Sequence, residues 1–256
     1  MIKFFRHIRK QLLGEGKTRK YFKYAIGEIL LVVIGILIAL QINNWNENKK
    51  LVSKEVKILK EIKYELEGSL RDLVSDIESH QRNLNSSIII RNTVLFKKKH
   101  HDSLNLHFLF LIDDETLTAK MSAFESLKSL GLEIISNDSI RQKITTAYLY
   151  MGELTSGESS ANIMAKKLES ILEPYMVIDR EKFISNPKLL KRTHWGRKIP
   201  FKFINYDALL IDEIFLFNVM NAIEFREGAI WYSLQFKKGI EEVISDITKE
   251  LKRLEQ

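Results

Sequence analysis

The chain contains one long run of apolar residues near its start. All twelve residues from Ile29 to Leu40 are apolar, and the wider stretch 24–42 is interrupted only by Glu28 and Gln41. Nineteen helical residues rise about 28 Å, which is close to the bilayer's hydrocarbon thickness of about 30 Å. The run has no polar face, which argues against a buried helix of a soluble protein. The pattern therefore predicts a transmembrane helix over residues 24–42.

After this run, apolar residues recur with the spacing of an amphipathic helix. Ten steps cover the 36 residues from Val52 to Ile88, which is a period of 3.6. A supercoiled seam would need a period of about 3.5, so a nearly straight helix in a bundle is expected. His80 occupies one position of this stripe and is interpreted as a core histidine. We expect a helix to about Phe96, and the pattern leaves open whether it is unbroken through residues 43–48.

Three more helices are expected further along the chain. The first covers about 119–130 and is closed by Gly131. The second begins at the capping residues 137–139, breaks near 152–160 and ends before Pro174; the third runs from Asn205 or Asp207 to the C-terminus.

The apolar stripe of that last helix is expected to include Ile214, Phe217 and Met220. The stretches 97–118, with its apolar insert Leu104–Ile112, and 175–205 are expected to be loops. The predicted fold class is all-α, with one N-terminal transmembrane helix followed by an extracytoplasmic antiparallel helical bundle with long helices.

Charge orients this architecture. The chain has 40 Lys and Arg against 33 Asp and Glu, a net charge of +7, and residues 1–23 alone hold eight basic and one acidic side chain. The rest of the chain is therefore neutral, which disfavours nucleic acid as a partner. By the positive-inside rule we expect residues 1–23 in the cytoplasm, 24–42 in the membrane and 43–256 outside the cytoplasm. Leu37, two residues before Ala39, disfavours signal-peptide cleavage, so a single-pass signal anchor is expected.

The basic leader has an amphipathic pattern of its own. Ile2, Phe5, Ile8 and Leu12 recur at helical spacing. The opposite face carries the basic residues Lys3, Arg6, Arg9 and Lys10. This pattern predicts a short helix on the anionic lipid bilayer surface, and a helix that docks on a partner protein would show the same pattern.

Three residues of the span suggest contacts inside the membrane. Gly35 and Ala39 form a small-xxx-small pair, on which a second span could pack closely. Glu28 is an ionisable residue near the cytoplasmic start of the span, from which its carboxylate can also reach the lipid headgroups. A homo-oligomer or another envelope protein is therefore the expected protein partner, and transmembrane packing through Glu28, Gly35 and Ala39 is a hypothesis.

A second basic region lies in the long loop before the last helix. Residues 182–206 hold seven Lys and Arg, no acidic residue before 206 and several aromatic side chains. This mixture can bind nucleic acid, but the expected extracytoplasmic location argues against that. We instead expect membrane-surface contact at the membrane-proximal end of the bundle, and a solvated loop packed on the bundle is the alternative. The residues of this hypothesis are Lys191, Arg192, Trp195, Arg197 and Lys198.

Catalytic and metal-binding patterns do not emerge from the sequence. The chain has no cysteine, which excludes disulfides, thiolate catalysis and zinc–thiolate sites. No nucleophile elbow, phosphate loop or zinc-protease motif is present. The segments 100–102 and 113–115 contain His, Asp and Glu, but neighbouring Lys97–Lys99 disfavour a cation there. The expectation is a protein that is not an enzyme and has no cofactor and no metal.

The N-terminal residues resemble a known family. The segments MIKFFRHIRKQLL and YAIGEILLVVIGILIALQINNWNE are similar to the N-terminal signature of an uncharacterised bacterial family, a domain of unknown function common in Bacteroidota. A weaker similarity covers AFESLKSLGLEIISNDSIRQKI, residues 123–144. The resemblance implies an inner-membrane protein with one N-terminal span and a helical periplasmic part, and it implies no catalytic residues. Glu28 and the residues after it are also similar to the start of type IV pilins, but Lys23 stands where pilins need glycine.

Taken together, these patterns predict a binding or scaffold role in the bacterial envelope. A sensory or signalling input module that acts through a membrane partner is the first alternative. A pilin-like or pseudopilin subunit is the second, and the missing glycine disfavours it.

Overall fold

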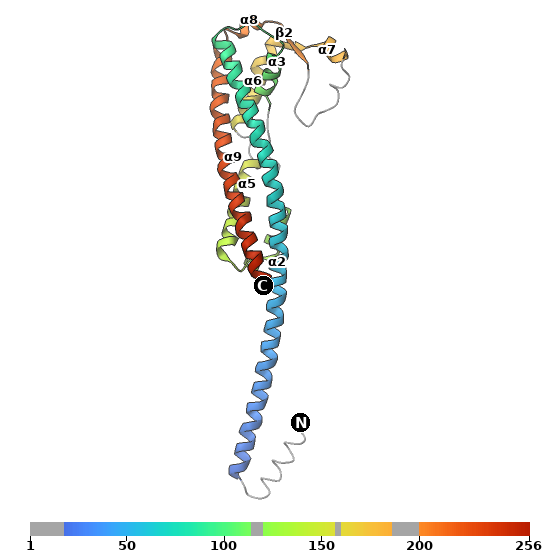
Figure 1. The fold of residues 1–256 in the computed structure, drawn as a ribbon, viewed down its shortest axis with the longest axis vertical. Helices are drawn as coiled ribbons and strands as arrows, with labels where there is room; N and C mark the ends of the chain where they lie inside the picture. Colours follow the sequence, from blue (N-terminus) through green and yellow to red (C-terminus); the bar gives the residue numbers. More distant parts are fainter. Residues whose placement is uncertain (1–17, 114–119, 157–159, 186–199) are drawn as a thin grey trace. The chain divides into compact units, whose positions relative to one another are not determined.

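The structure is a computed structural model that describes residues 18–113, 120–156, 160–185 and 200–256. The chain divides into two compact units, Met1–Lys57 and Ile58–Gln256, and each unit is described by itself. Helix α2 covers Thr18–Leu95 without interruption (Figure 1). The question left open by the sequence is therefore answered, because the helix is continuous through residues 43–48.

The described part of the first unit is helical throughout. The apolar side chains from Ile29 to Leu40 are exposed; Ile29, for example, is 64% exposed. Among the described residues, one helix is long and apolar enough to cross a membrane, and its apolar segment lies near the N-terminus. At the end of this segment, Lys49 Nζ lies 3.9 Å from the centroid of the exposed Trp45 ring. The predicted span thus agrees with the structure in length and composition.

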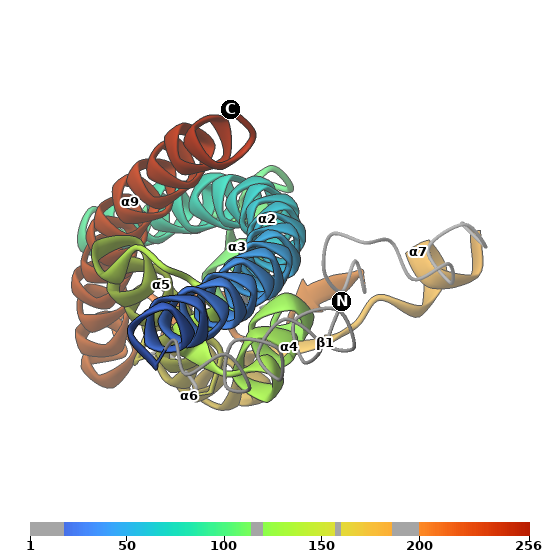
Figure 2. The ribbon, with the colours of Figure 1, turned by 90° about the horizontal axis from the view of Figure 1, so that it is seen from below.

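The second unit is a helical bundle, as the sequence predicts. Helices α5 and α6 pack against α9, and both views show α9 running along α2 (Figures 1 and 2). Lys60 Nζ of α2 lies 2.6 Å from Glu255 Oε1, just after the end of α9, and Arg226 of α9 donates to Asn83 O of α2 at 3.2 Å, so the two long helices are antiparallel. The elements after α2 are α3 (Leu104–Leu111), α4 (Ser122–Leu130), η1 (Leu132–Ile134), α5 (Asp138–Ser156), α6 (Ser160–Leu172), η2 (Glu173–Tyr175), β1 (Met176–Ile178), α7 (Arg180–Ser185), β2 (Phe201–Phe203), α8 (Tyr206–Leu209) and α9 (Glu213–Leu254).

Two helix ends follow the predicted chemistry. Gly131 has a φ of 95°, and its N–H donates to Lys128 O, which ends α4. Asn137 Oδ1 accepts hydrogen bonds from the backbone N–H groups of Ser139 (3.1 Å) and Ile140 (3.3 Å), which caps α5. Both positions were identified from the sequence alone.

Two expected loops contain secondary structure. Most of the apolar insert after α2 forms α3, and its buried side chains Phe108 and Leu111 pack in the core. The long loop contains the antiparallel strands β1 and β2, in which Val177 lies opposite Lys202. Each of these elements has eight or fewer residues, so its periodicity is too short to distinguish it from an apolar loop.

The start of the last helix also differs from the prediction. Asn205 begins only the short α8, whereas α9 is capped by Asp212, whose Oδ1 accepts from the N–H groups of Ile214 (2.9 Å) and Phe215 (3.0 Å). The turn between α8 and α9 shifts the helical phase. Phe215 is therefore buried, and Ile214 is 68% exposed. Phe217 and Met220, which were also expected on the buried stripe, are exposed as well.

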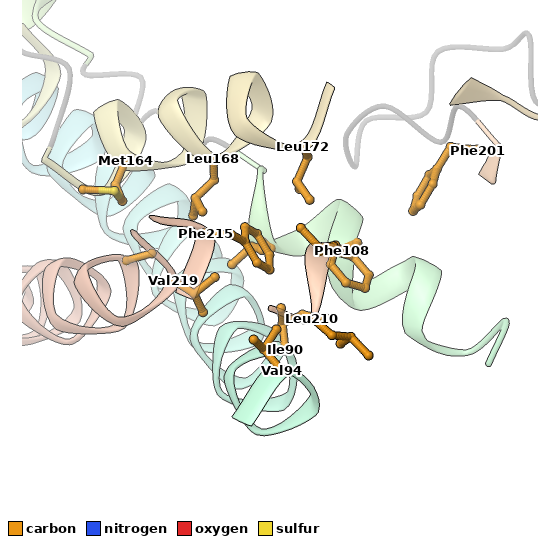
Figure 3. Packing of buried hydrophobic residues seen from close by; sticks show 13 residues of the cluster. Ile90, Val94, Phe108, Met164, Leu168, Leu172, Phe201, Leu210, Phe215 and Val219 are labelled. Carbon is orange, nitrogen blue, oxygen red and sulfur yellow. The ribbon is translucent and has the colours of Figure 1, made fainter. Parts of the chain in front are cut away.

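The main core cluster joins several elements at one end of the bundle. It contains Ile90 of α2, Phe108 of α3, Leu168 of α6 and Phe215 of α9, together with Leu209 of α8 (Figure 3 labels the first four). The rings of Phe108 and Phe215 are 6.4 Å apart between centroids and nearly parallel, at 20°. This cluster fixes one end of the bundle by burial of apolar surface.

A single buried carboxylate joins α2, α4 and α5. Glu65 Oε2 accepts hydrogen bonds from Ser122 Oγ (2.6 Å) and from the Ala123 N–H (2.9 Å) at the start of α4. Glu65 Oε1 accepts from the Tyr148 hydroxyl of α5 at 2.7 Å. A carboxylate at a helix N-terminus is favoured by the helix dipole. Glu65 therefore positions both helices on α2.

Candidate binding groove

Helices α5 and α9 lie in a defined antiparallel register. Lys143 Nζ contacts Asp246 Oδ2 at 2.5 Å, and Asn137 Nδ2 donates to Glu250 Oε2 at 3.3 Å. The residue number therefore rises along α5 as it falls along α9. The same register brings Glu153, in the last turn of α5, level with about Gln235 of α9.

A groove of about 820 Å³ follows this pair of helices, and its walls are mostly apolar. Each helix contributes residues three or four positions apart, as expected for one helical face. The volume lies in the range of ligand-binding clefts, about 300–1,000 Å³. The argument below uses Lys143, Tyr150 and Glu153 of α5 and Trp231, Tyr232, Phe236, Gly239 and Glu242 of α9.

Aromatic side chains are exposed at one end of the groove. The rings of Trp231 and Tyr232 are 5.0 Å apart between centroids and nearly perpendicular, at 81°. Trp231 is 56% exposed and Tyr232 is 65% exposed. Tyr150 of α5 is also exposed and lines the same groove. Three polarizable aromatic rings are therefore available to a bound molecule.

The ionisable side chains of the groove are mainly acidic. Its lining contains Lys143, Glu153 and Glu242. The ammonium group of Lys143 is held by Asp246: the hydrogen bond and charge of that carboxylate, with a smaller contribution from Glu242, raise the pKa of Lys143. In the described part of the chain, Glu153 and Glu242 form no ion pair within 4.0 Å. The groove therefore presents net negative charge.

Gly239 leaves space in the middle of the groove wall. A Cβ atom built at Gly239 would have no neighbour within 4 Å, and the same holds for Gly228 on α9, which does not line the groove. Neither glycine adopts a left-handed backbone conformation. Larger side chains therefore fit at both positions, but only a side chain at position 239 would enter the groove.

The interior of the bundle contains a different polar centre. Arg226 of α9 is almost fully buried, at 1% exposure. Its guanidinium donates to the carbonyl oxygens of Asn83 (3.2 Å), Leu111 (2.7 Å) and Asp113 (3.3 Å), and to Ser87 Oγ (2.5 Å). These bonds join α9 to α2 and to the end of α3, so Arg226 stabilises the packing of these helices.

Two titratable groups of α2 lie near this centre. Burial, together with the positive charge of Arg226, lowers the pKa of His80 to about 4. Burial raises the pKa of Asp76 to about 6. His80 Nε2 and Asp76 Oδ2 are 3.5 Å apart, and because the imidazole is neutral near pH 7 their contact is not an ion pair there. The prediction that His80 is a core residue is confirmed, since only 6% of it is exposed.

The hypothetical metal ligands are engaged with other partners. His100 Nε2 lies 2.8 Å from Asn105 Oδ1, and Lys182 Nζ donates to Asp102 Oδ2 at 3.1 Å. Asp113 Oδ2 lies 3.6 Å from Nη2 of Arg82, within an ion pair. No group of three or more His, Asp or Glu suited to a metal occurs among the residues that the structure describes. Residues 114 and 115 lie outside that part of the chain.

The residues predicted to touch the membrane surface lie outside the part of the chain that the structure describes. Residues 1–17 and 186–199 lie outside the described ranges, and with them all nine side chains of that hypothesis. Glu28, Gly35 and Ala39 are described, on α2; Gly35 and Ala39 are exposed and Glu28 is partly exposed. A Cβ at Gly35 would meet nothing within 4 Å, so the surface of this chain leaves room for close packing there.

The flanks of the basic loop lie at an end of the bundle that the sequence argument did not expect. Tyr206 donates to Lys98 O at 3.1 Å, and the rings of His100 and Phe203 are 5.2 Å apart. Both contacts lie just beyond Leu95, whereas the topology argument placed the loop at the Ile58 end. The reason is that α5 and α6 both lead toward the Leu95 end, so the loop after them starts there.

The aromatic end of the groove was not predicted from the sequence. The predicted apolar stripe of the last helix passes through Ile230 and Leu234, and Trp231 and Tyr232 lie between them, off the stripe. Two adjacent aromatic residues off the stripe of a long helix were the available signal. The facing residues Tyr150 and Glu153 carry no such signal, because only the fold brings them to α9.

Comparison with known proteins supports part of the resemblance found in the sequence. Residues 28–150 match the model of a family of unknown function, DUF6090. The matched segment contains most of α2, all of α3 and α4 and most of α5, including Glu65 and Tyr148; α9 lies outside it. No curated protein and no solved structure matches the chain.

Proposed function

We propose that this chain is a single-pass protein of the bacterial inner membrane whose periplasmic helical bundle binds a ligand in the groove between α5 and α9. Binding, and not catalysis, is the role of this site. The observation that carries the proposal is the groove itself, which combines an apolar wall, exposed aromatic rings and carboxylates that have no ion-pair partner among the described residues. In monomeric soluble domains, contiguous exposed apolar surface of this kind marks binding sites.

Two observations support the orientation. The excess of basic residues lies before the apolar segment, which by the positive-inside rule keeps residues 1–23 in the cytoplasm. Trp45 and Lys49 follow the apolar segment and contact each other, as is typical of residues at a membrane–water interface. The bundle after Ile58 is then periplasmic, and the lipid bilayer is a constant partner of the chain.

The absence of cysteine allows a direct test of the orientation. The variants Lys10→Cys and Gly228→Cys each carry one thiol, on the two expected sides of the membrane. In cells with a permeabilised outer membrane, a membrane-impermeant maleimide should label only the Gly228→Cys variant. Labelling of Lys10→Cys in intact inner membranes, with Gly228→Cys unlabelled, would contradict the proposed topology.

The same chemistry tests binding in the groove. A bound ligand should slow the labelling of Gly239→Cys, whose thiol lies in the groove, by at least about fivefold. We expect this protection when periplasmic extract is present and its loss after the membranes are washed. Gly228→Cys is the matched control, since it is on the same helix and its surroundings are equally open. Equal labelling rates of the Gly239→Cys variant with and without extract would count against a binding groove.

One observation favours a second function, a sensory input module. Helix α2 is continuous from the apolar segment into the bundle, so the element that carries part of the bundle core also carries Gly35 and Ala39. A ligand could then act on a membrane partner through this helix. A photo-crosslinking residue at position 35 tests this: a specific adduct with a signalling protein would support it, and an adduct with the chain itself would indicate a homo-oligomer.

A further inference from the structure

We propose that the groove between α5 and α9 takes an amphipathic organic cation, with an ammonium head at the aromatic end and an apolar body along the helices. This inference rests on the proposed binding function and specifies its ligand class. Three features of the groove support it: the geometry of the aromatic rings, the sign of the charge and the position of the end of α5.

The aromatic rings offer open faces to a cation. In an edge-to-face pair such as Trp231 and Tyr232, one ring covers at most one face of the other, and the large exposed fractions of both side chains leave the other faces accessible. Ammonium groups are attracted to the negative faces of aromatic rings, and Trp binds them best. Tyr150 contributes a third ring from the facing helix. Rings that meet at about a right angle form the corner of an aromatic cage.

The charges of the groove select a cation over an anion. Glu153 and Glu242 line the groove, and the one lysine of the lining, Lys143, is compensated by Asp246. At the aromatic end an anionic head would therefore meet the carboxylate of Glu153, which forms no ion pair among the described residues, and no available ammonium group from the lining. Glu153 lies level with about Gln235, close to the aromatic corner formed by Trp231 and Tyr232.

The end of α5 adds to this preference. Glu153 lies in the last turn of α5, which ends at Ser156. The last carbonyl groups of a helix carry partial negative charge and favour cations nearby. The carboxylate of Glu153 and this helix end therefore act in the same direction. Between the aromatic rings and Lys143, the residues Ala147, Phe236 and Val243 supply apolar wall for the body of the ligand.

The test uses the full chain in zwitterionic lipid nanodiscs with Trp45→Phe and Trp195→Phe, so that Trp231 is its single tryptophan. Three probes share a phenylbutyl body and differ in the head: trimethylammonium, hydroxyl and sulfonate. Binding is followed by Trp231 fluorescence, with protein-free nanodiscs as the control for lipid partitioning. We expect the ammonium probe to bind at least about tenfold more tightly than the sulfonate probe and about threefold more tightly than the alcohol.

Single variants separate the head from the body. Glu153→Gln and Tyr232→Leu should each weaken binding of the ammonium probe by about three- to tenfold and change binding of the alcohol by less than twofold. Glu78→Gln is the matched control, because Glu78 is an exposed glutamate within α2 outside the groove. Gly239→Leu should lower the affinity for every probe that binds by at least about tenfold, whereas Gly228→Leu should leave these affinities unchanged.

The outcomes distinguish this inference from the proposed function. Equal affinities for the three heads, with loss of binding in the Gly239→Leu variant, would overturn the cation assignment and leave a binding groove of another specificity. No probe binding together with unchanged labelling of the Gly239→Cys variant would overturn both. If periplasmic extract protects the Gly239→Cys thiol from labelling but no probe binds, only the assignment of a small organic cation would be overturned. The occupant would then be a helix of a partner protein.

Discussion

Two regions of α9, the buried Arg226 and the exposed aromatic pair Trp231 and Tyr232, differ in whether their side chains are partnered within the chain or open to a ligand. Arg226 donates hydrogen bonds to Asn83 and Ser87 of α2 and to Leu111 of α3, and its side chain is almost fully buried. At Trp231, Tyr232 and the facing Glu153, rings and carboxylate are exposed to the groove. These two regions are about one and a half turns apart on one helix.

This difference predicts which measurement each region should change. A buried polar group partnered by the chain contributes to stability, because removing one partner leaves others buried and unsatisfied. An exposed aromatic or acidic side chain contributes little to stability, so its placement in a groove is explained by binding instead. Variants in the first region should therefore lower the free energy of unfolding, and variants in the second should change binding alone.

Arg226→Met should cause the largest loss of stability. The substitution keeps much of the side-chain volume but leaves Ser87 Oγ and the carbonyl oxygens of Asn83 and Leu111 without their charged donor. We expect the free energy of unfolding to fall by about 3–5 kcal/mol. Urea unfolding of the full chain in nanodiscs, followed by Trp231 fluorescence, measures this. Lys238→Met, on the exposed side of α9, should change it by less than about 0.5 kcal/mol; similar losses in the two variants would contradict the assignment.

The pair His80 and Asp76 should make the bundle pH-sensitive in opposite directions. The pKa of His80 is about 4 in the fold and 6.5 ordinarily, so its contribution is complete above pH 6.5 and lost as the pH falls through 4. The pKa of Asp76 is about 6 in the fold and 3.8 ordinarily, so its contribution is complete below pH 3.8 and lost as the pH rises through 6.

The two variants separate these contributions. When the pH falls from 7 to 4.5, the Asp76→Asn variant should lose up to about 3 kcal/mol of stability, which is more than the unsubstituted chain loses. The reason is that only His80 then contributes to the pH dependence. His80→Gln should instead gain stability over the same range. Urea titrations at both pH values check this, and identical pH slopes in the two variants would show that the groups are not buried as the structure places them.

Tyr148→Phe should have a smaller effect. It removes the hydroxyl that donates to Glu65 Oε1 but keeps the ring stacked on Phe124, with centroids 4.5 Å apart. Burial and the hydrogen bond to Glu65 raise the pKa of Tyr148, in agreement with a hydroxyl that stays protonated. We expect a loss of about 2 kcal/mol, since the bond is made to a buried carboxylate. Tyr64→Phe, at an exposed tyrosine of α2, should be nearly neutral; an equal loss there would argue against this role of the Tyr148 hydroxyl.

Features of the fold that depend on residues close together in the sequence were predictable, whereas features that depend on residues far apart in the sequence were not. The long first helix with its apolar segment, the end of α4 at Gly131 and the cap at Asn137 depend on neighbouring residues, and the sequence predicted them. The phase of α9 depends on the turn that separates it from α8, so extrapolating one stripe across that turn placed Ile214 in the core and missed Phe215.

The groove depends on pairing that is remote in the sequence. Glu153 and Trp231 belong to different helices, and the register set by Lys143 with Asp246 brings them to one site. Arg226 is a similar case, because an arginine within a helix gives no indication in the sequence that its partners are carbonyl groups of α2 and α3. Local patterns therefore predicted the elements, whereas the candidate site required the three-dimensional arrangement.

Gly239→Ala should produce the smallest change in stability and the clearest separation of the two regions. An alanine Cβ at position 239 meets open space, and alanine is favoured over glycine within a helix. We expect the free energy of unfolding to rise by about 0.5–1 kcal/mol, and Gly228→Ala should give the same increase. Only Gly239→Ala should also alter probe affinity, by about two- to threefold, because its methyl group enters the groove. Equal changes of affinity in both variants would show that the substitution acts by altering α9 as a whole and not by placing a methyl group in the groove.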